Sequence, residues 1–577
     1  MGIRATLLGM HYAALGTDYD GTLAHDGIVD EATIAALEKL RAAQRRLILV
    51  TGRELEDLQR VMPRLDLFDR VVAENGALLY RPDTREERTL ADPPPPRFVA
   101  RLREAGVQPL SAGRVIVATW EPNETTVLES IHALGLELQI IFNKGAVMVL
   151  PAGIHKGTGL AAALGDLELS AIDCAGVGDA ENDNAFLSVC GLSVAVANAL
   201  PALKESAAIV TEGARGAGVA ELIERLLKDD PTDLEPRAAR QRVPLAGPAD
   251  GGEPLFLTPR RDTLLLAGAS GGGKSTLALG LLERLGEAGF QYCVIDPEGD
   301  YESSLPALAL GTPETSPEIH QAMEVLRRPG QSAVINLLAL PLADRPRFFA
   351  ALLPELLVLR ARTSRPHFIL VDEAHHMLAS DLDPVCALLS ADLTGFMFIT
   401  VHPDRLPRQA VESATQLLIV GAAPGEAAAA FCRLRHSPCP PAGLTLEAGQ
   451  ACALRPGDAL ARKVHVLPAT ATRRRHLRKY AEGKLGDDKS FYFRGPDGRL
   501  NLRAHNLSLF VQLADGVDLE TWEHHRRAHD YSRWIETAIK DPTLAEQVAG
   551  IERSDVSSED ARRRVREAIE AKYTAPA

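Results

Sequence analysis

Short apolar runs and amphipathic, helix-like stretches alternate along most of the chain. In residues 8–228, for example, the apolar run 46–50 is followed by the helix-like stretch 54–62. Such alternation predicts a parallel sheet with helices on both faces. The alternation returns in residues 255–468, whereas residues 473–577 contain short, mostly helical segments behind a basic run. The pattern predicts two α/β domains and a small, mainly helical C-terminal module.

Two segments interrupt this alternation. Residues 229–254 are rich in proline, glycine and charged side chains, which is typical of a linker. Inside the first domain, residues from about 84 to 151 contain a strand, a helix and a hairpin with an Asn143-Lys144-Gly145 turn. This insertion is longer than a crossover between parallel strands needs. We interpret it as an α+β cap that covers a site and excludes water.

Composition narrows the class of protein. A length of 577 residues suggests three or four compact units, and a net charge of −14 argues against a generally cationic nucleic-acid binder. The seven cysteines are scattered, which favours neither a zinc site nor a disulfide framework. The N-terminal apolar stretch runs directly into a strand with candidate catalytic residues, so we do not interpret it as a signal peptide. No apolar run approaches the ~20 residues of a membrane span. We expect a soluble, cytoplasmic protein with no membrane partner.

Asp18 and Asp20 follow the first predicted strand. Residues two apart in an extended segment point the same way, and ligands of a doubly wound sheet bind beyond the carboxyl ends of its strands. One carboxylate can therefore attack phosphorus while its neighbour handles the proton of the leaving group. Two adjacent carboxylates repel each other and a phosphate, so this site needs a cation.

Three more motifs supply the remaining groups. Thr51, in a Thr-Gly-Arg sequence at the end of a strand, offers a hydroxyl and backbone N–H groups to a phosphoryl oxygen. Lys156, in GIHKGTG, provides a fixed positive charge. Asp179 and Asp183, in GDAEND after another apolar strand, are hard oxygen donors of the kind that Mg²⁺ prefers.

These four motifs, in this order, resemble the haloacid dehalogenase superfamily, and the spelling GDAENDNAF resembles its Cof-type sugar-phosphatase branch. The resemblance covers roughly residues 10–228 and implies a Rossmann-like core. It implies that Asp18 is the nucleophile that forms an aspartyl-phosphate and that Asp20 is the general acid/base. Thr51 and Lys156 would hold the phosphoryl group.

The resemblance also implies a magnesium site. Asp18, Asp179 and the backbone of Asp20 would bind Mg²⁺, and Asp183 would support the metal site. Asn75, in AENGA, fits the same branch. The substrate would be a small phosphorylated molecule, and phosphosugars and phosphoglycolate-like acids are expectations at the level of the family.

A glycine-rich loop opens the second α/β domain. It follows the apolar run TLLLA, precedes a helix-like stretch and has the form G-x-x-x-x-G-K-[ST]. Backbone N–H groups of such a loop close around phosphates at a helix N-terminus. We expect Lys274 to reach the β- and γ-phosphates and Ser275 to bind Mg²⁺. The expected ATP site comprises Gly268, Gly271, Gly273, Lys274, Ser275 and Thr276.

An acidic pair ends a later apolar strand, FILVDEAHH. Asp372 would take part in metal binding, and Glu373 would polarise the attacking water. Together with DPEGDY at residues 296–301, this arrangement resembles the HerA–FtsK group of motor ATPases. In that group the next strand usually ends in a polar sensor, most often glutamine, and His402 holds that place here.

Several functions stay open for this second domain. Enzymes of the HerA–FtsK group work as rings with an arginine from the next subunit, so a homo-oligomer is expected, with Arg433 and Arg435 as candidates. Alternatively, the domain binds ATP as a switch or assembly module, and only the phosphatase performs chemistry. A phosphatase beside a P-loop domain also resembles polynucleotide kinase-phosphatases, although the acidic pair favours water as the acceptor. Nucleic acid is therefore an open partner that no motif supports.

Aromatic and basic residues interleave in the C-terminal module. Tyr531 and Trp534 lie among arginines and could stack on bases, but an amphipathic helix with its aromatics in a small core is the favoured interpretation. The histidines within residues 524–529 lack a cysteine or acidic partner at ligand spacing. The role of this module is not readable from the sequence.

Overall fold

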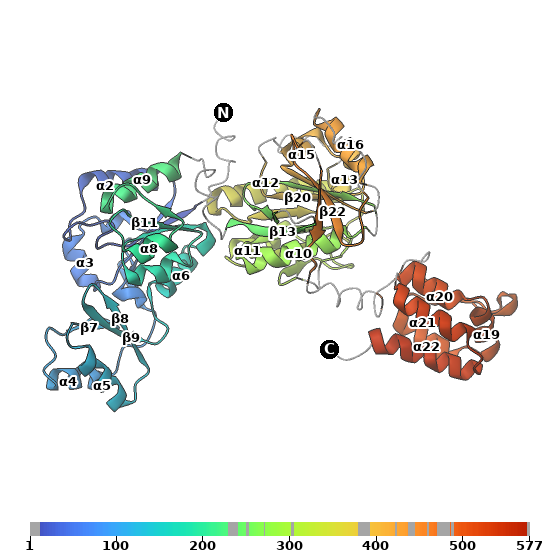
Figure 1. Cartoon of the computed structure of the whole chain (residues 1–577), viewed down its shortest axis with the longest axis horizontal. Coiled ribbons are helices and arrows are strands. Elements are labelled where there is room, and N and C mark those ends of the chain that lie inside the picture. Colours follow the sequence, from blue (N-terminus) through green and yellow to red (C-terminus); the bar gives the residue numbers. More distant parts are fainter. Residues whose placement is uncertain are drawn as a thin grey trace. The chain divides into compact units, whose positions relative to one another are not determined.

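The computed structural model of the chain is drawn in Figure 1. The chain divides into two compact units. The first unit comprises Met1–Glu302 and Pro306–Leu467, and the second comprises Ser303–Leu305 and Pro468–Ala577. The structure describes residues 12–228, 241–249, 253–269, 272–301, 305–378, 393–421, 424–436, 445–458, 461–469, 480, 485, 490–539 and 541–573.

The first sheet contains eight strands in the order β12-β11-β10-β1-β2-β3-β4-β5. The strands from β12 to β3 are parallel, and β4 and β5 add antiparallel at one edge. Their bounds are β1 (Ala14–Thr17), β2 (Arg46–Val50), β3 (Arg70–Ala73), β4 (Leu78–Arg81), β5 (Glu86–Thr89), β10 (Cys174–Gly178), β11 (Leu192–Ala195) and β12 (Ile209–Val210).

Helices connect these parallel strands, as the alternating pattern predicts. All four residues of the central strand β1 are buried, as expected for a strand covered on both faces. The side chain of Asp30 accepts a hydrogen bond from the Thr33 N–H and caps the first of the connecting helices. These helices are α2 (Glu31–Ala42), α3 (Leu55–Val61), α6 (Lys156–Asp166), α7 (Asn184–Leu187), α8 (Pro201–Ser206) and α9 (Arg215–Leu227).

A separate four-stranded antiparallel sheet forms the predicted cap. Its strand order is β6-β7-β9-β8, and it has its own apolar core around Phe98, Val127 and Val147. The cap starts later than about residue 84, because β5 pairs with β4 and belongs to the first sheet. Its elements are α4 (Pro96–Glu104), β6 (Ser111–Ala112), β7 (Val117–Trp120), α5 (Glu124–Leu134), β8 (Leu138–Asn143) and β9 (Ala146–Pro151).

The second sheet contains eleven strands in the order β14-β13-β23-β22-β21-β15-β20-β19-β16-β18-β17. The strands from β21 to β17 are parallel, and those from β14 to β22 are antiparallel. Their bounds are β13 (Val243–Pro248), β14 (Leu255–Leu257), β15 (Leu264–Gly268), β16 (Tyr292–Asp296), β17 (Leu308–Leu310), β18 (Ala333–Asn336), β19 (Phe368–Val371), β20 (Phe396–Thr400), β21 (Gln416–Val420), β22 (Gln450–Leu454) and β23 (Arg462–Val466).

Strand β13 corrects part of the prediction of a linker over residues 229–254, of which residues 229–240 and 250–252 lie outside the described residues. It pairs antiparallel with β14 and β23, and its Leu245 and Ala246 side chains are buried. Two prolines of this segment lie in the strand, Pro244 beside a register shift and Pro248 at its last residue, where proline is tolerated. The helices of this part are α10 (Lys274–Glu287), α11 (Ile319–Arg327), α12 (Arg345–Thr363), α13 (Ala374–Met377), α15 (Arg408–Ser413) and α16 (Gly425–Leu434).

A buried polar cluster joins the two large sheets of the first unit. Asp173 directly precedes β10, and its Oδ1 lies 2.9 Å from Nε2 of His367, which directly precedes β19. Asp173 also pairs with Arg260, and the Arg365 Nε lies 3.8 Å from its Oδ2. All four side chains are buried. The strands β10 and β19 are thus tied together at their N-terminal ends, opposite the ends that carry the candidate site residues.

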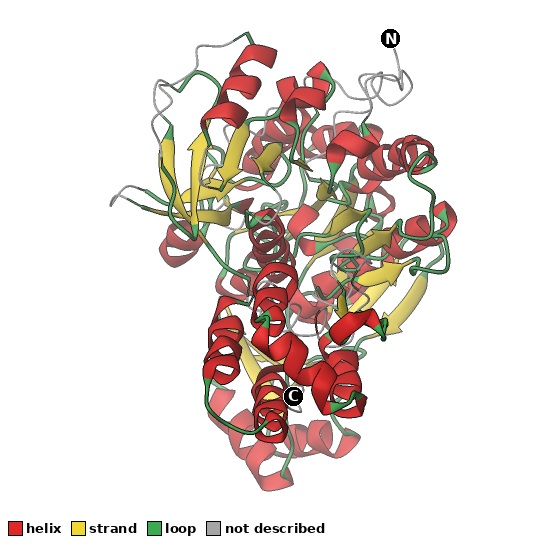
Figure 2. Ribbon diagram, turned by 90° about the vertical axis from the view of Figure 1, so that its right-hand side faces the viewer, coloured by secondary structure: helices red, strands yellow, loops and turns green. Residues whose placement is uncertain are grey.

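The second unit is mainly helical, with one short hairpin (Figure 2). Tyr531 and Trp534 are buried in its aromatic core, and the Tyr531 ring stacks on Trp522 at 4.3 Å between centroids. These aromatic side chains therefore form part of the core, which is the interpretation that the sequence favoured. The elements of this unit are β24 (Phe491–Phe493), β25 (Leu502–Ala504), α18 (Leu507–Gly516), α19 (Leu519–Arg527), α20 (Asp530–Trp534), α21 (Pro542–Arg553) and α22 (Ser558–Tyr573).

Within the part of the chain that the structure describes, no helix combines the length and the apolar character that crossing a bilayer requires.

Candidate functional site

The first candidate site lies at the carboxyl ends of three neighbouring parallel strands. Asp18 follows β1, Asp179 follows β10 on one side of it, and Thr51 follows β2 on the other. The carboxylates of Asp18, Asp179 and Asp183 offer oxygens that all lie within 4.8 Å of one another. The structure therefore brings together the three carboxylates that the sequence placed in one site.

Lys156 lies at the centre of this carboxylate group. Its Nζ donates to Oδ1 of Asp18 and to Oδ1 of Asp183, each at 2.6 Å, and the lysine is buried. Burial lowers the pKa of Lys156, but the two carboxylates outweigh burial and raise it above its ordinary value. Burial, followed by the charge of Asp183, raises the pKa of Asp18 to about 7 against the opposing effect of Lys156. Without further positive charge, the nucleophile predicted from the sequence is thus hard to ionise.

Asp183 orients the loop that follows β10. Its Oδ2 accepts hydrogen bonds from the backbone N–H groups of Asp179 and Ala180, at 2.8 and 2.9 Å, while its Oδ1 receives Lys156. Its side chain is fully buried. Because all these contacts are charge-assisted, Asp183 holds Asp179 and Lys156 in place, which agrees with a supporting role.

Asp20 is held by an arginine that sequence reasoning did not assign. Arg53 binds both carboxylate oxygens of Asp20 through Nε and Nη2, each at 2.7 Å, and also pairs with Asp57. Hydrogen bonding to Asp20 raises the pKa of the Arg53 guanidinium further above its already high value. The Thr-Gly-Arg sequence therefore contributes a positioning arginine as well as Thr51, whose buried Oγ1 accepts from the Arg53 N–H at 3.2 Å.

Two residues connect this site to the cap. Lys144, in the β8–β9 turn, donates from Nζ to Oδ2 of Asp179 at 2.9 Å and to the Asp20 carbonyl at 3.1 Å. Glu74 is fully buried and accepts from the N–H groups of Arg114, Val115 and Ile116, at 2.7 to 2.9 Å. The sequence showed Lys144 only as a turn residue, and no signal distinguished Glu74, because both roles depend on the three-dimensional approach of the cap.

Asn75 pairs with another residue of the acidic loop. Its Oδ1 accepts from Nδ2 of Asn182 at 3.0 Å, and both side chains are buried. The outer amide atoms, Nδ2 of Asn75 and Oδ1 of Asn182, have no hydrogen-bond partner among the described residues. Asn75 has a left-handed backbone with φ 55°, which asparagine tolerates better than most residues. Sequence reasoning identified Asn75 and missed Asn182.

The donor set of this site fits Mg²⁺. Carboxylate oxygens of Asp18 and Asp179 and the carbonyl oxygen of Asp20 are hard donors. Among the described contacts, the Asp179 carboxylate is otherwise hydrogen-bonded only by Thr22 and Lys144. Burial raises the pKa of Asp179 despite Lys144, so a divalent cation would also favour its ionised form. The cofactor that the sequence predicts is therefore compatible with the residues present.

The glycine-rich loop connects β15 to α10, as the sequence predicts. Gly268 has φ 153°, and a Cβ there would overlap the Val420 carbonyl oxygen, while Gly273 has φ 95°. Nζ of Lys274 donates to the carbonyls of Gly268 and Ala269, at 2.8 and 3.0 Å. Gly271 lies outside the described residues, and the first turn of α10 contains Lys274, Ser275 and Thr276.

The acidic pair lies at the end of β19. Asp372 is buried and accepts from the Tyr301 hydroxyl at 3.1 Å, and burial raises its pKa to about 7. Burial lowers the pKa of Lys274, whereas the negative charges of Glu373 and Asp372 act in the opposite direction. The charges of these three groups therefore interact.

His402 lies just beyond the end of β20, near the acidic pair. Strand β20 lies between β15 and β19 in the sheet, so His402, just beyond its end, follows the strand that separates the glycine-rich loop from the acidic pair. The His402 ring lies 5.2 Å from that of His375, whose Nδ1 is 3.4 Å from Oε2 of Glu373. Sequence reasoning missed His375. Arg435, a candidate trans-acting arginine, instead donates to backbone carbonyls at the end of α15.

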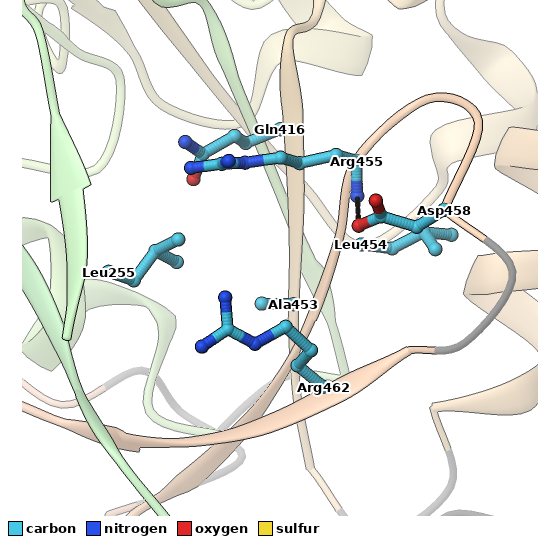
Figure 3. Close-up of a pocket in the computed structure, with 7 residues that line it drawn as sticks. All are labelled: Leu255, Gln416, Ala453, Leu454, Arg455, Asp458 and Arg462. Atoms are coloured by element: carbon cyan, nitrogen blue, oxygen red, sulfur yellow. Dashed lines mark hydrogen bonds between the residues drawn. The ribbon is translucent and has the colours of Figure 1, made fainter. Parts of the chain in front are cut away.

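A hollow of about 280 Å³ lies elsewhere in the second sheet (Figure 3). Its wall includes Gln416, Arg455 and Arg462. Gln416 begins β21, whose other end, Val420, pairs with Gly268 of the glycine-rich loop. The hollow is therefore at the opposite end of β21 from the second candidate site.

Comparison with known proteins assigns the first domain. Residues 15–105 and 127–223 match the family model described as haloacid dehalogenase-like hydrolase. The chain is similar to the phosphoglycolate phosphatase of Methanothermobacter thermautotrophicus, with 32% identity over 37% of this chain and 98% of that protein. It is also similar to phosphoglycolate phosphatase 2 of Saccharolobus solfataricus, with 30% identity over 38% of this chain and 94% of that protein.

A solved haloacid dehalogenase-like hydrolase from Bacteroides thetaiotaomicron aligns with 37% of this chain and 99% of its own, with 19% identity and a TM-score of 0.34. This chain covers almost the whole length of both phosphoglycolate phosphatases. The strand order places the matched motifs at one edge of the sheet. Through its N-terminal domain, the chain belongs to the haloacid dehalogenase-like hydrolases.

Proposed function

We propose that residues 12–228 form a Mg²⁺-dependent phosphomonoesterase that acts through an aspartyl-phosphate on Asp18. The observation that carries this proposal is the buried position of the Asp18 carboxylate, 2.6 Å from the Lys156 ammonium and beside Asp179 and Asp183. A carboxylate held between a fixed cation and metal-binding oxygens is suited to attack phosphorus.

The proposed reaction has two steps. An oxygen of Asp18 bonds to phosphorus while the ester P–O bond breaks, and Asp20 gives a proton to the leaving oxygen. Water then attacks phosphorus, Asp20 takes its proton, and the bond from Asp18 to phosphorus breaks to release phosphate. Lys156 and Thr51 hold the non-reacting oxygens. Bound Mg²⁺ would supply positive charge between the carboxylates and the phosphoryl group, with Asp18, Asp179 and the Asp20 carbonyl as its ligands.

Arg53 gives this scheme a positioning residue. It holds both oxygens of Asp20, so Asp20 must exchange one of these hydrogen bonds for the leaving-group oxygen during the reaction. The Asp20 side chain is 40% exposed, which leaves room for that exchange. For the substrate we propose a small phosphorylated acid, because the relatives at 30 and 32% identity are phosphoglycolate phosphatases. A phosphosugar is the alternative.

The test is phosphate release from p-nitrophenyl phosphate with and without Mg²⁺. We expect Asp18→Asn to lose activity by at least about 10³-fold, because no second group can form the covalent intermediate. Asp26→Asn is the matched control, since the Asp26 side chain is 91% exposed. Acid quenching should trap labelled phosphate on the wild-type chain only. Wild-type turnover by Asp18→Asn would refute the assignment.

We also propose that the glycine-rich loop binds ATP and that Glu373 activates water for its hydrolysis. Three observations support this proposal. Lys274 lies at the start of α10, and its charge interacts with those of Asp372 and Glu373. His402 lies just beyond β20, the strand between the glycine-rich loop and the acidic pair. Ser275 would bind the Mg²⁺ that accompanies the nucleotide. An ATP-driven ring would use this hydrolysis, and a nucleotide-dependent assembly module and a polynucleotide kinase are the alternatives.

Binding and turnover separate these forms. In an Asp18→Asn chain, where the phosphatase site adds no phosphate, Lys274→Ala should abolish binding of a fluorescent ATP analogue. Glu373→Gln should retain binding and lose hydrolysis by about 10²-fold. Lys463→Ala, on β23, serves as a control. DNA-stimulated turnover supports a motor, ATP-dependent oligomerisation without turnover supports assembly, and phosphate transfer to a 5′-hydroxyl oligonucleotide supports a kinase. Equal binding by wild type and Lys274→Ala would remove the proposal.

A further inference from the structure

The tip of the cap contributes a cation to the Asp18 site. Lys144 lies in the two-residue turn between Asn143 and Ala146, with φ 48°, and its Nζ reaches the Asp179 carboxylate and the Asp20 carbonyl. Its side chain is 48% exposed, whereas that of Asp179 is 6% exposed. The lysine thus enters a buried site from a solvent-exposed turn, which leaves it free to change partners.

The two oxygens that Lys144 contacts are two of those that fit Mg²⁺. A magnesium ion lies about 2.0–2.1 Å from its oxygen ligands, so it would fall well inside the space that the ammonium group needs. The two cations would also repel each other strongly at that distance. Gly21 shows how little room remains, because a Cβ there would lie 2.9 Å from Nζ of Lys144 and would overlap Asp179. Lys144 and Mg²⁺ therefore compete for the same place.

A displaced Lys144 still extends from the cap over the site. Lys156 already neutralises part of the charge of Asp18 and Asp183, and Mg²⁺ would neutralise more of it, so a negatively charged group of the substrate is a new partner for the displaced ammonium group. The phosphoryl group must lie next to Asp18 to react, so the organic part of the ester would extend from it towards the cap, which contributes Lys144. A cation at that point favours a substrate with a second negative group, such as a carboxylate.

We propose that Lys144 is a metal-gated specificity residue. It pairs with Asp179 until Mg²⁺ takes the shared oxygens, and it then binds the carboxylate of a small phosphorylated acid. This inference rests on the phosphatase function proposed above. It assigns the preference for a carboxylate to one side chain of the cap, and it links the cap to metal loading through a single ammonium group.

The first test measures Mg²⁺ binding by calorimetry on the full chain without substrate. Lys144→Ala removes the competing cation and should tighten Mg²⁺ binding by about three- to tenfold, whereas Lys39→Ala, exposed on α2, should match the wild type. Any contribution from the glycine-rich loop is the same in all variants, so it cancels from the comparison. Unchanged or weaker Mg²⁺ binding in Lys144→Ala would overturn the competition.

The second test uses three phosphate esters of similar size whose far ends differ in charge. These are 2-phosphoglycolate with a carboxylate, ethyl phosphate with a neutral end, and O-phosphoethanolamine with an ammonium group. The wild type should prefer them in that order by kcat/KM. Lys144→Ala should reduce the ratio of the first to the second by about tenfold, and Lys144→Arg should restore much of it.

Charge reversal gives a further outcome. Lys144→Glu should shift the preference towards O-phosphoethanolamine. Equal losses on all three esters would show that Lys144 has no role in selection and would contradict the proposal. If the Asp18→Asn variant instead kept wild-type turnover, that result would refute the phosphatase assignment itself. The two failures are therefore distinguishable.

Discussion

The ammonium group of Lys156 lies 2.6 Å from the Asp18 carboxylate, and the same group lies 2.6 Å from Asp183. This single buried cation separates two carboxylates that would otherwise face each other in a medium of low dielectric constant. Lys156 begins α6, where the His155 side chain accepts from the N–H groups of Gly157 and Thr158 and caps the helix. The cap of one helix therefore positions the cation on which the proposed nucleophile depends.

Replacing Lys156 should damage both stability and activity. In Lys156→Met, Asp18 and Asp183 remain buried without their partner, and breaking such a pair typically costs about 3–5 kcal/mol. We expect a lower urea midpoint for the first unit and a loss of kcat of about 10²-fold or more. Lys156→Met/Asp183→Asn removes one of the two repelling charges. It should regain part of the stability without regaining activity, and a single variant as stable as wild type would contradict the role of Lys156.

Glu74 should control the motion of the cap. In Glu74→Gln, an amide NH₂ replaces one of the two oxygens that accept from three backbone N–H groups of residues 114–116. Charge-assisted hydrogen bonds contribute about 1.5–3 kcal/mol, so amide exchange in this segment should accelerate by about 10- to 100-fold. The control is Glu87→Gln, which alters an exposed contact with the Arg114 side chain. Equal exchange rates in the two variants would count against an anchoring role.

The sequence located the carboxylates of the first site because strand ends are encoded locally. Asp18 and Asp179 each follow a short apolar strand, and parallel strands align their carboxyl ends whatever their order in the sheet. Lys156 was assigned from the GIHKGTG motif, and its role followed from the family resemblance. Only the placement of the two carboxylates needed no more than the local pattern and the rule that binding occurs at one edge of the sheet.

Contacts made by long side chains could not be predicted in this way. Arg53 and Asp20 lie on two different strand ends, and their pairing depends on rotamers that no spacing encodes. The contact of Lys144 with Asp179 requires that a separate sheet, that of the cap, lies close to the site. Strand β13 was interpreted as part of a linker because residues 229–254 are rich in proline, glycine and charged side chains. Its antiparallel partners, β14 and β23, come from segments on both sides of the glycine-rich loop.

Two glycines that both have a positive φ should tolerate substitution differently. Gly76 has φ 107°, and a Cβ there would overlap the carbonyl group of His155, directly before Lys156. Gly153 has φ 81°, and a Cβ there would meet nothing within 4 Å. Alanine at either position incurs the left-handed penalty of about 1–2 kcal/mol. Gly76→Ala should lose about 1–3 kcal/mol more, together with phosphatase activity, because the backbone that positions Lys156 must move.

The comparison of these variants isolates the close contact from the backbone strain. Thermal unfolding and kcat should be measured for both. Similar losses would show that conformation alone, rather than the approach of His155, explains the glycine at position 76.

His367 should make the stability of the first unit depend on pH. Its Nδ1 accepts from the Gln291 N–H at 2.7 Å, and its Nε2 faces Asp173, so only the neutral ring with its proton on Nε2 satisfies both contacts. Burial lowers the pKa of His367, and Arg260 and Arg365 add to that effect against Asp173. The unfolded chain binds a proton near pH 6.5 and the folded chain does not, so stability falls as the pH decreases below about 6.5.

The maximum slope for one such group is about 1.4 kcal/mol per pH unit. Unfolding free energies of the first unit should therefore be compared at pH 7.5 and 5.5 by pulse proteolysis. His367→Gln cannot take up the proton and should lose about 1 kcal/mol less than wild type over this interval. His320→Gln, at an exposed histidine, should follow the wild type. If His367→Gln also followed the wild type, the buried ring would not be the group that resists protonation.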